Sequence, residues 1–424
     1  MTRVCHFCSE VTDANLEYSD FSLVFIGKMC VLDKKPPQQS EGFKQRVIRA
    51  LLYCTGEMQH FHIHMQDKIF LLQLVEWCLR GTSQVILVNN PLSGALILGA
   101  LLLESPWLAL LGILGLLAST FTAVILGQDC EEMYTQIEEI SSGHYGFNGM
   151  LVALLIGAFS SAGNWYWWLL LPACLGGATT TFLSSGLATI LDRWDLPVSV
   201  FPFNTIILLY LACTGTSNPY FPNTPALPPG APESTNLTQL HVPQWAESTS
   251  QQLSIKLLQG AVLGVGQIFA CQTVGPSLLI LVAVLIFSPI LTVYAIFGSV
   301  IGIVAGLSVS VQQGFLYSGL AGFNGALGCM TVGAHFIFNW RTHLLSIASA
   351  FLSSYSDIAL GNLLGFVGLP PSSWASTLTG TLMLLLTGKN LRGYRIPIEQ
   401  VTSPEMNLHP CFQWSEANTD VADV

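Results

Sequence analysis

Long runs of apolar residues recur along most of this chain, separated by short polar or proline-bearing segments. In the first half they cover residues 85–103, 107–127, 147–162, 165–191 and 198–214. These lengths are near the ~20 residues that an α-helix needs to cross the hydrocarbon layer of a bilayer. The pattern therefore predicts an all-α, polytopic membrane protein whose first half crosses the bilayer an odd number of times.

Polar segments divide the chain into parts. The predicted organisation is a polar tail (1–68), a first transmembrane repeat (69–214), an insert (215–254), a second transmembrane repeat (255–388) and a second tail (389–424). The insert is rich in proline and contains the sequon Asn236-Leu237-Thr238, which is an acceptor for N-glycosylation when it faces outside.

The two apolar regions repeat one another, with a spacing that shortens slightly from one matched pair to the next. The matched pairs, in chain order, are Gly81–Gln84 with Gly264–Gln267, Ser142–Gly149 with Ser318–Gly325 and Leu196-Pro197 with Leu369-Pro370. Two homologous halves with an odd number of crossings insert in opposite senses, which places a site near the midplane where the halves meet. The run Asn89-Asn90-Pro91 interrupts the first apolar stretch and predicts a re-entrant or broken helix, because proline lacks a backbone donor.

Charge is scarce and unevenly distributed. Only 9% of residues are charged, against about 25% in soluble domains, and the mean hydropathy is +0.56. Nine of the fifteen Lys and Arg residues precede Gly81, and Lys389, Arg392 and Arg395 lie in the second tail, so both tails are expected in the cytosol. Five spans between the first tail and the insert then place the insert outside. The body of the chain therefore has no basic face that could bind nucleic acid. We expect the lipid bilayer to surround it.

Neutral polar side chains, rather than charges, are the candidate chemistry of the spans. Charged residues such as Glu104 and Asp195 fall at span ends, so we expect passive conduction rather than coupling to an ion. Gln84 and Gln267 are matched by the repeat and offer hydrogen bonds to a small polar solute without the cost of a buried charge. The alternative for such side chains is hydrogen bonding between helices.

Aromatic and leucine side chains supply a second candidate feature. Phe147 and Leu151 lie one helical turn apart, and the repeat matches them to Phe323 and Leu327. Each half can thus offer a flat apolar wall, and two walls form a slot that admits a planar neutral solute and rejects a hydrated ion. The alternative is ordinary packing in the core or against lipid.

No metal, cofactor or catalytic group is predicted. Cys5-His6-Phe7-Cys8 has one cysteine pair without a second, and the alternating His60, His62 and His64 lack a further ligand set. No phosphate-binding loop or nucleophile elbow is present, so neither transport driven by ATP nor hydrolase chemistry has support, and an enzyme is not expected.

The run Arg80–Gly94 resembles the signature of the urea transporter family. Further blocks that agree with it are Trp167–Pro172, Trp194–Val198, Gly264–Ile268, Gly322–Asn324 and Thr342–Leu345. The resemblance covers roughly residues 47–404. It implies passive, channel-like urea transport by a cell-membrane homotrimer with one pore in each subunit. Each subunit of the family has two inverted halves of five transmembrane helices plus a re-entrant half-helix.

The resemblance also implies roles for individual residues. Gln84 and Gln267 fall at the two mouths of the filter, and Thr179 and Ser353 fall near its centre. Phe147, Leu151, Phe323 and Leu327 become the slot walls, and Asn236 becomes the glycosylated residue of the extracellular loop.

Departures from the family pattern fall mainly in the second half. The counterpart of the Asn-Pro signature, normally an acidic-Asn-Pro run, here reads Cys271–Pro276, and Val200 stands at a family threonine. The alternatives to urea conduction are a channel of the same fold for ammonia, water or another small amide, and a non-conducting structural or regulatory membrane protein.

Overall fold

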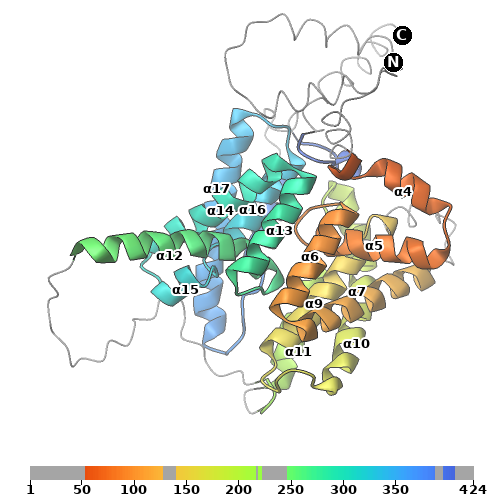
Figure 1. The fold of residues 1–424 in the computed structure, drawn as a ribbon, viewed down its shortest axis with the longest axis horizontal. Helices are drawn as coiled ribbons and strands as arrows, with labels where there is room; N and C mark the ends of the chain where they lie inside the picture. Colours follow the sequence, from red (N-terminus) through yellow and green to blue (C-terminus); the bar gives the residue numbers. More distant parts are fainter. Residues whose placement is uncertain (1–52, 128–139, 216–217, 222–245, 387–394, 406–424) are drawn as a thin grey trace, which may run out of the picture. The chain divides into compact units, whose positions relative to one another are not determined.

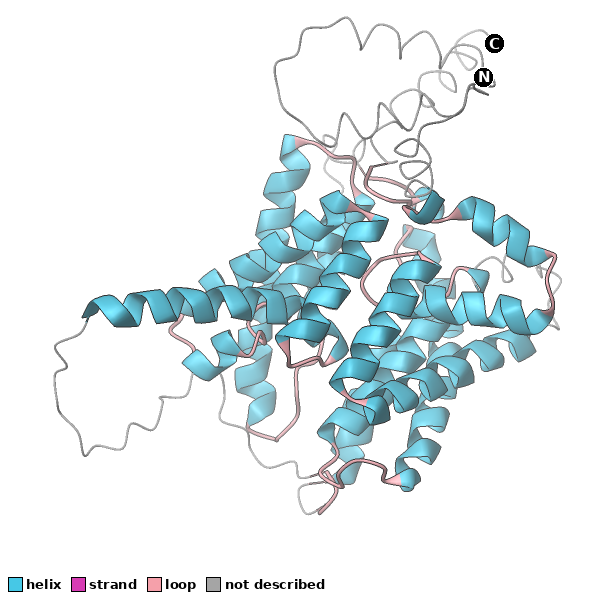
Figure 2. Cartoon of the chain, viewed as in Figure 1, coloured by secondary structure: helices cyan, strands magenta, loops and turns pink. Residues whose placement is uncertain are grey.

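The computed structural model describes residues 53–127, 140–215, 218–221, 246–386 and 395–405. The chain forms two compact units, Met1–Thr55 and Gly56–Val424, and the account below concerns the second. Within the described residues the regular structure is helical, and the β pairing is confined to an isolated bridge between Phe336 and Arg395 (Figure 2). The all-α prediction is confirmed.

The helices of the first half follow the predicted apolar runs. In chain order they are α4 (Gln59–Gln66), α5 (Phe70–Gln84), α6 (Pro91–Glu104), α7 (Pro106–Gly127), α9 (Gly146–Phe159), α10 (Leu170–Leu191) and α11 (Phe201–Thr214). Proline at the first position of α6 and α7 fits a helix start, where a missing N–H costs no hydrogen bond. Helix α5 was not among the predicted apolar runs, because Glu76 and Arg80 interrupt its hydrophobic pattern.

The second half repeats the order from α5 onward. Its helices are α12 (Ala246–Gly266), α13 (Val274–Phe287), α14 (Pro289–Ser308), α15 (Gln313–Tyr317), α16 (Phe323–His335), α17 (Trp340–Gly365) and α18 (Trp374–Leu385). Of these, α12, α13, α14, α16, α17 and α18 are equivalent to α5, α6, α7, α9, α10 and α11. Helix α12 starts inside the segment that the sequence assigned to the insert. Asn236 and most of the insert lie outside the described residues.

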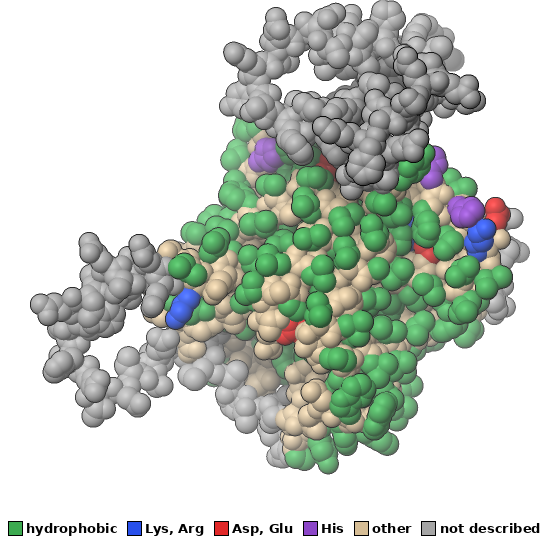
Figure 3. Space-filling view, viewed as in Figure 1, with side chains coloured by type: hydrophobic (Ala, Val, Ile, Leu, Met, Phe, Trp, Pro, Cys, Tyr) green, Lys and Arg blue, Asp and Glu red, His purple; other side chains and the backbone are tan. Residues whose placement is uncertain are grey.

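Four helices are long and apolar enough to span a bilayer on their own: α7, α14, α17 and the segment Trp167–Trp194, which contains α10. Shorter apolar helices are α6, α9, α11 and α18, and the pair Ser254–Phe269 with Val274–Phe287 is bent by 76°. Hydrophobic side chains cover the visible face of the described helices, with few charged groups among them (Figure 3). The protein is therefore a multi-pass membrane protein, with lipid covering its exposed apolar residues.

The two halves break their backbone at equivalent positions. Leu87, after α5, and Ala270, after α12, correspond by the repeat and both adopt left-handed backbone angles, with φ of 59° and 58°. Ser199 and Ser372 also correspond, and they do the same ahead of α11 and α18, with φ of 51° and 48°. Left-handed backbone is uncommon in non-glycine residues, so its recurrence at matched sites supports the repeat strongly.

Glycine permits the close approach of the same elements in each half. A Cβ on Gly143 would lie 2.3 Å from the backbone nitrogen of Gly81, and a Cβ on Gly319 would lie 2.5 Å from that of Gly264. The first pair corresponds to the second by the repeat. Glycine is therefore required at both crossings, where φ is also positive at Gly143 and Gly319.

Equivalent helices of the two halves meet one another. Helix α6 packs beside α13, and the Ser93 hydroxyl donates to the Ala283 carbonyl at 2.6 Å (Figure 1). The amide of Asn204 donates to the hydroxyl of Thr377 at 3.0 Å, and the repeat matches these two residues to one another. Contact between equivalent residues is what a pseudo-two-fold relation between the two halves predicts, with its axis near α11 and α18.

Candidate solute pathway

The two repeat-matched glutamines lie at the C-terminal ends of equivalent helices. Gln84 is the last residue of α5, and Gln267 follows α12 in a short 3₁₀ turn. The Gln84 amide nitrogen lies 3.1 Å from Nε2 of His144, and the Gln267 amide donates to the Ser318 carbonyl at 2.9 Å. Both amides therefore reach the same repeated loop, which precedes α9 in one half and α16 in the other.

Each glutamine begins a short irregular stretch, which we call the first filter segment (85–90) and the second filter segment (268–273). Each segment contains the left-handed residue described above and ends where α6 or α13 begins. The sequence predicted the break at Asn89-Asn90-Pro91, and the structure has it between Gln84 and Pro91.

Two candidate pathway residues carry a buried polar atom without a hydrogen-bond partner among the described residues. These atoms are Oε1 of Gln84 and Oγ of Ser353. A buried acceptor or hydroxyl that stays unpaired costs about 1–3 kcal/mol, so each atom would gain stability from a hydrogen-bonding group that reached it. Both atoms are neutral, as solute recognition without ion coupling requires.

The predicted wall residues belong to one hydrophobic cluster. Phe147 and Leu151 of α9 are buried in it, and Phe323 and Leu327 of α16 are half-buried and pack against it. The pairs lie on equivalent helices, one from each half. Their chemistry is apolar throughout and cannot replace the water shell of an ion.

Two adjacent threonines of α10 are candidates for the hydroxyl near the centre of the pathway. Thr179 is exposed on α10 and its hydroxyl donates to the Leu175 carbonyl at 2.7 Å. Thr180 is fully buried, lies 3.2 Å from the Ser119 hydroxyl, and is the repeat equivalent of Ser353. Thr179, which the family resemblance singled out, and Thr180, which the repeat pairs with Ser353, thus differ sharply in burial.

Two asparagines hold the turns that precede α11 and α18. Asn148 donates to the Ser199 carbonyl at 3.0 Å and accepts from the Phe203 backbone at 3.2 Å. Asn324 donates to the Ser372 carbonyl at 3.1 Å and accepts from the Ser376 backbone at 3.2 Å. All six residues correspond by the repeat. These buried amides satisfy backbone groups of the two turns, which water does not reach.

The expectation that the centres of the spans lack charge was wrong at Asp357. This residue lies within α17, is 1% exposed, and accepts a hydrogen bond from the Asn324 amide at 2.8 Å. Its repeat equivalent is Ser184, whose buried hydroxyl has no partner among the described residues. Alignment of the repeat through α17 exposes this substitution, whereas hydropathy alone hides one carboxylate in a long span.

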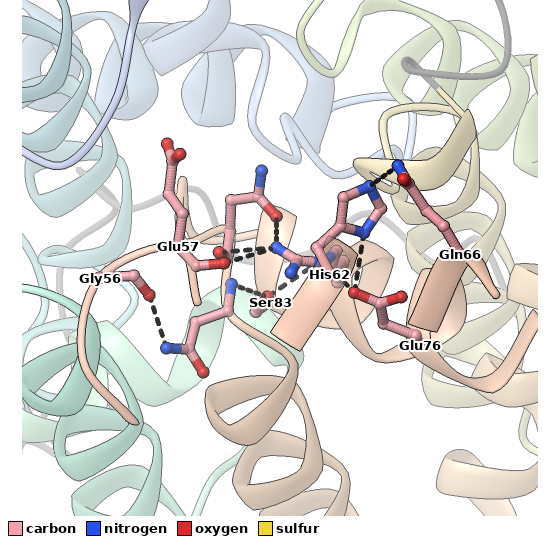
Figure 4. A network of polar contacts seen from close by, with 9 residues as sticks. Gly56, Glu57, His62, Gln66, Glu76 and Ser83 are labelled. Atoms are coloured by element: carbon pink, nitrogen blue, oxygen red, sulfur yellow. Dashed lines mark hydrogen bonds and ion pairs between the residues drawn. The ribbon is translucent and has the colours of Figure 1, made fainter. Parts of the chain in front are cut away.

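A second charged group lies buried beside the first filter segment (Figure 4). Nε of Arg80 donates to Glu76 at 2.9 Å, and Nη1 of Arg80 donates to the side-chain oxygen of Asn89 at 2.8 Å. Nδ1 of His62 on α4 also lies 2.9 Å from the Glu76 carboxylate. Both Arg80 and Glu76 are almost fully buried, so α5 carries a compensated ion pair into the protein interior.

A C-terminal segment ties several helix ends together. Arg395 forms an ion pair with Asp195 at 3.2 Å, and the Ile396 backbone donates to the His335 carbonyl at 2.9 Å. Further along, Glu405 accepts from the Ser288 hydroxyl at 2.8 Å. Burial raises the pKa of Glu405, while the hydrogen bonds from Ile290 and Ser288 act in the opposite direction.

Comparison with known proteins places the chain in a family. Residues 75–388 match the family model described as urea transporter. The chain is 40% identical to urea transporter 1 of Ovis aries over 370 residues, which are 87% of this chain and 91% of that protein. It is 38% identical to urea transporter 1 of Rattus norvegicus over 361 residues, covering 85% and 89% of the two chains. The chain therefore belongs to the urea transporter family.

Proposed function

We propose that this protein conducts urea passively through a narrow pathway between its two halves. Family membership supports the substrate, and the observation that carries the pathway is the pair of unpartnered buried atoms, Oε1 of Gln84 and Oγ of Ser353. Urea has amide hydrogens that Oε1 can accept and a carbonyl to which the serine hydroxyl can donate.

The apolar walls account for selection against ions. Urea is planar and neutral, so it can pass edge-on between Phe147 and Leu151 on one side and Phe323 and Leu327 on the other. A hydrated cation would lose water without receiving replacement ligands from these side chains. We propose these four residues, with Gln84, Gln267, Thr179 and Ser353, as the solute pathway.

Conduction without ion coupling is consistent with how the interior charges are paired. Arg80 and Glu76 neutralise one another, and the Asp357 carboxyl is hydrogen-bonded to Asn324. None of these contacts requires an ion that enters with the solute and leaves with it. We therefore propose facilitated diffusion down the urea gradient.

Orientation and assembly are further parts of the proposal. The Gly56 backbone donates to the Phe287 carbonyl, and Glu405 contacts Ser288, so both ends of the unit reach the same corner between α13 and α14. This supports two tails on one side, which the basic residues assign to the cytosol. The insert is then exofacial in the cell membrane with glycan on Asn236, and we propose a homotrimer by family resemblance.

The decisive experiment is solute flux into proteoliposomes that contain the purified protein. Urea uptake should exceed that of empty vesicles and should not change when proton and sodium gradients are collapsed. Water, ammonia and formamide fluxes are measured in parallel. Faster ammonia or water flux without urea flux would assign another substrate, and no flux of any kind would favour a structural role.

The orientation has its own test in a host that glycosylates proteins. Enzymatic deglycosylation should shift the electrophoretic mobility of the wild type and leave that of Asn236→Gln unchanged. A wild-type protein without a mobility shift would contradict an exofacial, glycosylated insert.

The homotrimer has a separate test. Light scattering of the purified protein in detergent should give three chains per particle.

A further inference from the structure

The two filter segments follow the same backbone path but are held by different groups. In the first filter segment, Arg80 donates to Asn89, and Asn90 is held from both sides. The Asn90 backbone donates to the Ser83 hydroxyl at 3.2 Å, and its side-chain oxygen accepts from the Ser93 backbone at 3.0 Å. The anchors of this segment are therefore residues of its own half.

Each of these anchors is missing from the second half. By the repeat, Arg80 corresponds to Leu263, Ser83 to Gly266 and Asn90 to Thr273. A side chain at position 266 is also excluded, because a Cβ there would lie 2.0 Å from the Ser277 hydroxyl. Pro276 occupies the third position of α13, where Ser93 supplies its N–H in α6. The second filter segment thus cannot be fixed in the way that the first is.

A carboxylate from the other half takes over this role. Oε1 of Glu104, the last residue of α6, accepts from the Gln272 backbone at 3.1 Å. Oε2 accepts from the Thr273 backbone at 3.3 Å and from the Thr273 hydroxyl at 2.5 Å. Both oxygens of one ionisable side chain are thus engaged at the end of the second filter segment. The repeat equivalent of Glu104 is Phe287, which cannot accept such bonds.

The anchored end is tied to Gln267 by a short chain of contacts. The Ala270 backbone donates to the Gln267 carbonyl at 3.0 Å, and the Cys271 backbone donates to the Gly266 carbonyl at 3.1 Å. Ala270 also holds a left-handed conformation that an unanchored chain would leave readily. The position of the Gln267 amide therefore depends on where residues 272 and 273 are held.

We propose that Glu104 is a positioning residue for solute conduction, which fixes the second filter segment and thereby the Gln267 amide. This inference rests on the proposed function of the pathway. Hydrogen bonds to a carboxylate are stronger than those to a neutral acceptor, and only a group with two accepting oxygens satisfies all three donors. Glutamine at this position retains the shape but offers one accepting oxygen.

The test compares Glu104→Gln with the wild type in proteoliposomes and uses Cys271 as a native reporter. Cys271 lies buried inside the second filter segment, and Cys329 lies buried in α16. We expect urea flux to fall at least about threefold, because charge-assisted bonds to the loop are lost. Labelling of Cys271 by a small thiol reagent, followed by peptide mass spectrometry, should speed up by a similar factor. Labelling of Cys329 should not change.

The matched control is Asp192→Asn, which removes a carboxylate at the end of α10. It should leave both flux and Cys271 labelling at the wild-type level. Unchanged flux and labelling in Glu104→Gln would overturn the proposal, as would equal acceleration at Cys271 and Cys329, which reports general loosening. If the wild type fails to conduct urea, the proposed function falls, and the labelling pattern still decides whether Glu104 anchors the segment.

Discussion

The first and second halves differ most where their backbones are most alike. Both carry a helix that ends at a glutamine, a left-handed residue soon after it and a new helix after that. The first half holds this turn with a cation and an asparagine of its own, whereas an anion from the opposite half contacts the second. The same backbone turn needs hydrogen-bond partners in both halves of a repeated fold, but different side chains can supply them.

The two anchors are also expected to differ in whether their loss affects stability or conduction. The first anchor, Arg80, is part of a buried ion pair and links α5 to Asn89, so its loss affects the core of its half. The second anchor, Glu104, lies half-buried at a helix end and contacts only a loop through the bonds described. Perturbing the first should unfold the protein, while perturbing the second should alter conduction in a folded protein.

The largest expected effect is that of Arg80→Gln. This change leaves Glu76 buried without its guanidinium partner, and breaking a buried ion pair typically costs about 3–5 kcal/mol. We expect a much lower midpoint of thermal unfolding in detergent and little protein at the cell surface. Fluorescence-detected size-exclusion chromatography after heating measures the midpoint, and surface biotinylation measures the amount at the cell surface.

A matched control is Arg193→Gln, which removes an exposed cation near the end of α10. Its effect on stability should stay within about 0.5 kcal/mol, as for most surface substitutions. If Arg80→Gln is as stable as this control, the first filter segment does not depend on the ion pair, and the contrast between the halves disappears.

A smaller effect is expected for substitutions of the two glutamines. These substitutions test whether equivalent amides of the two halves both contact the solute. Gln84→Leu and Gln267→Leu keep similar bulk and remove one neutral hydrogen-bonding group, worth about 0.5–1.5 kcal/mol and thus a several-fold loss of urea flux. Gln313→Leu on α15 is the matched control, since Gln313 is exposed and contacts Tyr317. Equal flux in all three variants at equal surface expression would show that the pathway runs elsewhere.

An effect no larger than that of the glutamine variants is expected for Asp357→Ser, which gives the second half the residue of the first. Asn324 keeps its bond to the Ser372 carbonyl, so its amide is not orphaned and the free energy of unfolding should fall by only about 1 kcal/mol. Thermal unfolding and urea flux are both measured, with Ser346→Ala, a buried hydroxyl of the same helix, as the comparison. A loss as large as that of Arg80→Gln would mean that Asp357 supports far more than one amide.

The repeat and the approximate positions of most helices in the first half could be predicted from sequence, because both leave local marks. Apolar runs of spanning length, Pro106 at a helix start and the Asn89-Asn90-Pro91 interruption each act on residues nearby. Helix α5 was not predicted because Glu76 and Arg80 interrupt its apolar pattern, and these charges are paired only in the folded protein. Local hydropathy records the cost of a charge and not the contact that compensates it.

The anchors of the filter could not be predicted for the same reason. Glu104 is far in sequence from its partners Gln272 and Thr273, and nothing in the sequence around it marks an acceptor for a distant loop. Because Glu104 lies at the end of a span, the sequence predicted a charge at the membrane interface instead. The central threonine was equally ambiguous, because Thr179 and Thr180 are adjacent and alike, and only helix rotation decides which one is buried.

The contact between Asn204 and Thr377 bears on how such a chain can arise. In a symmetric dimer of separate halves, a residue on the axis faces its own copy, and asparagine would meet asparagine. Here an amide donates to a hydroxyl, so the two sides of the axis have become chemically different. That requires the two halves to be encoded separately, as they are in the two repeats of this chain, because each half can then change alone. The same freedom allowed Glu104 and Phe287 to diverge at the ends of α6 and α13.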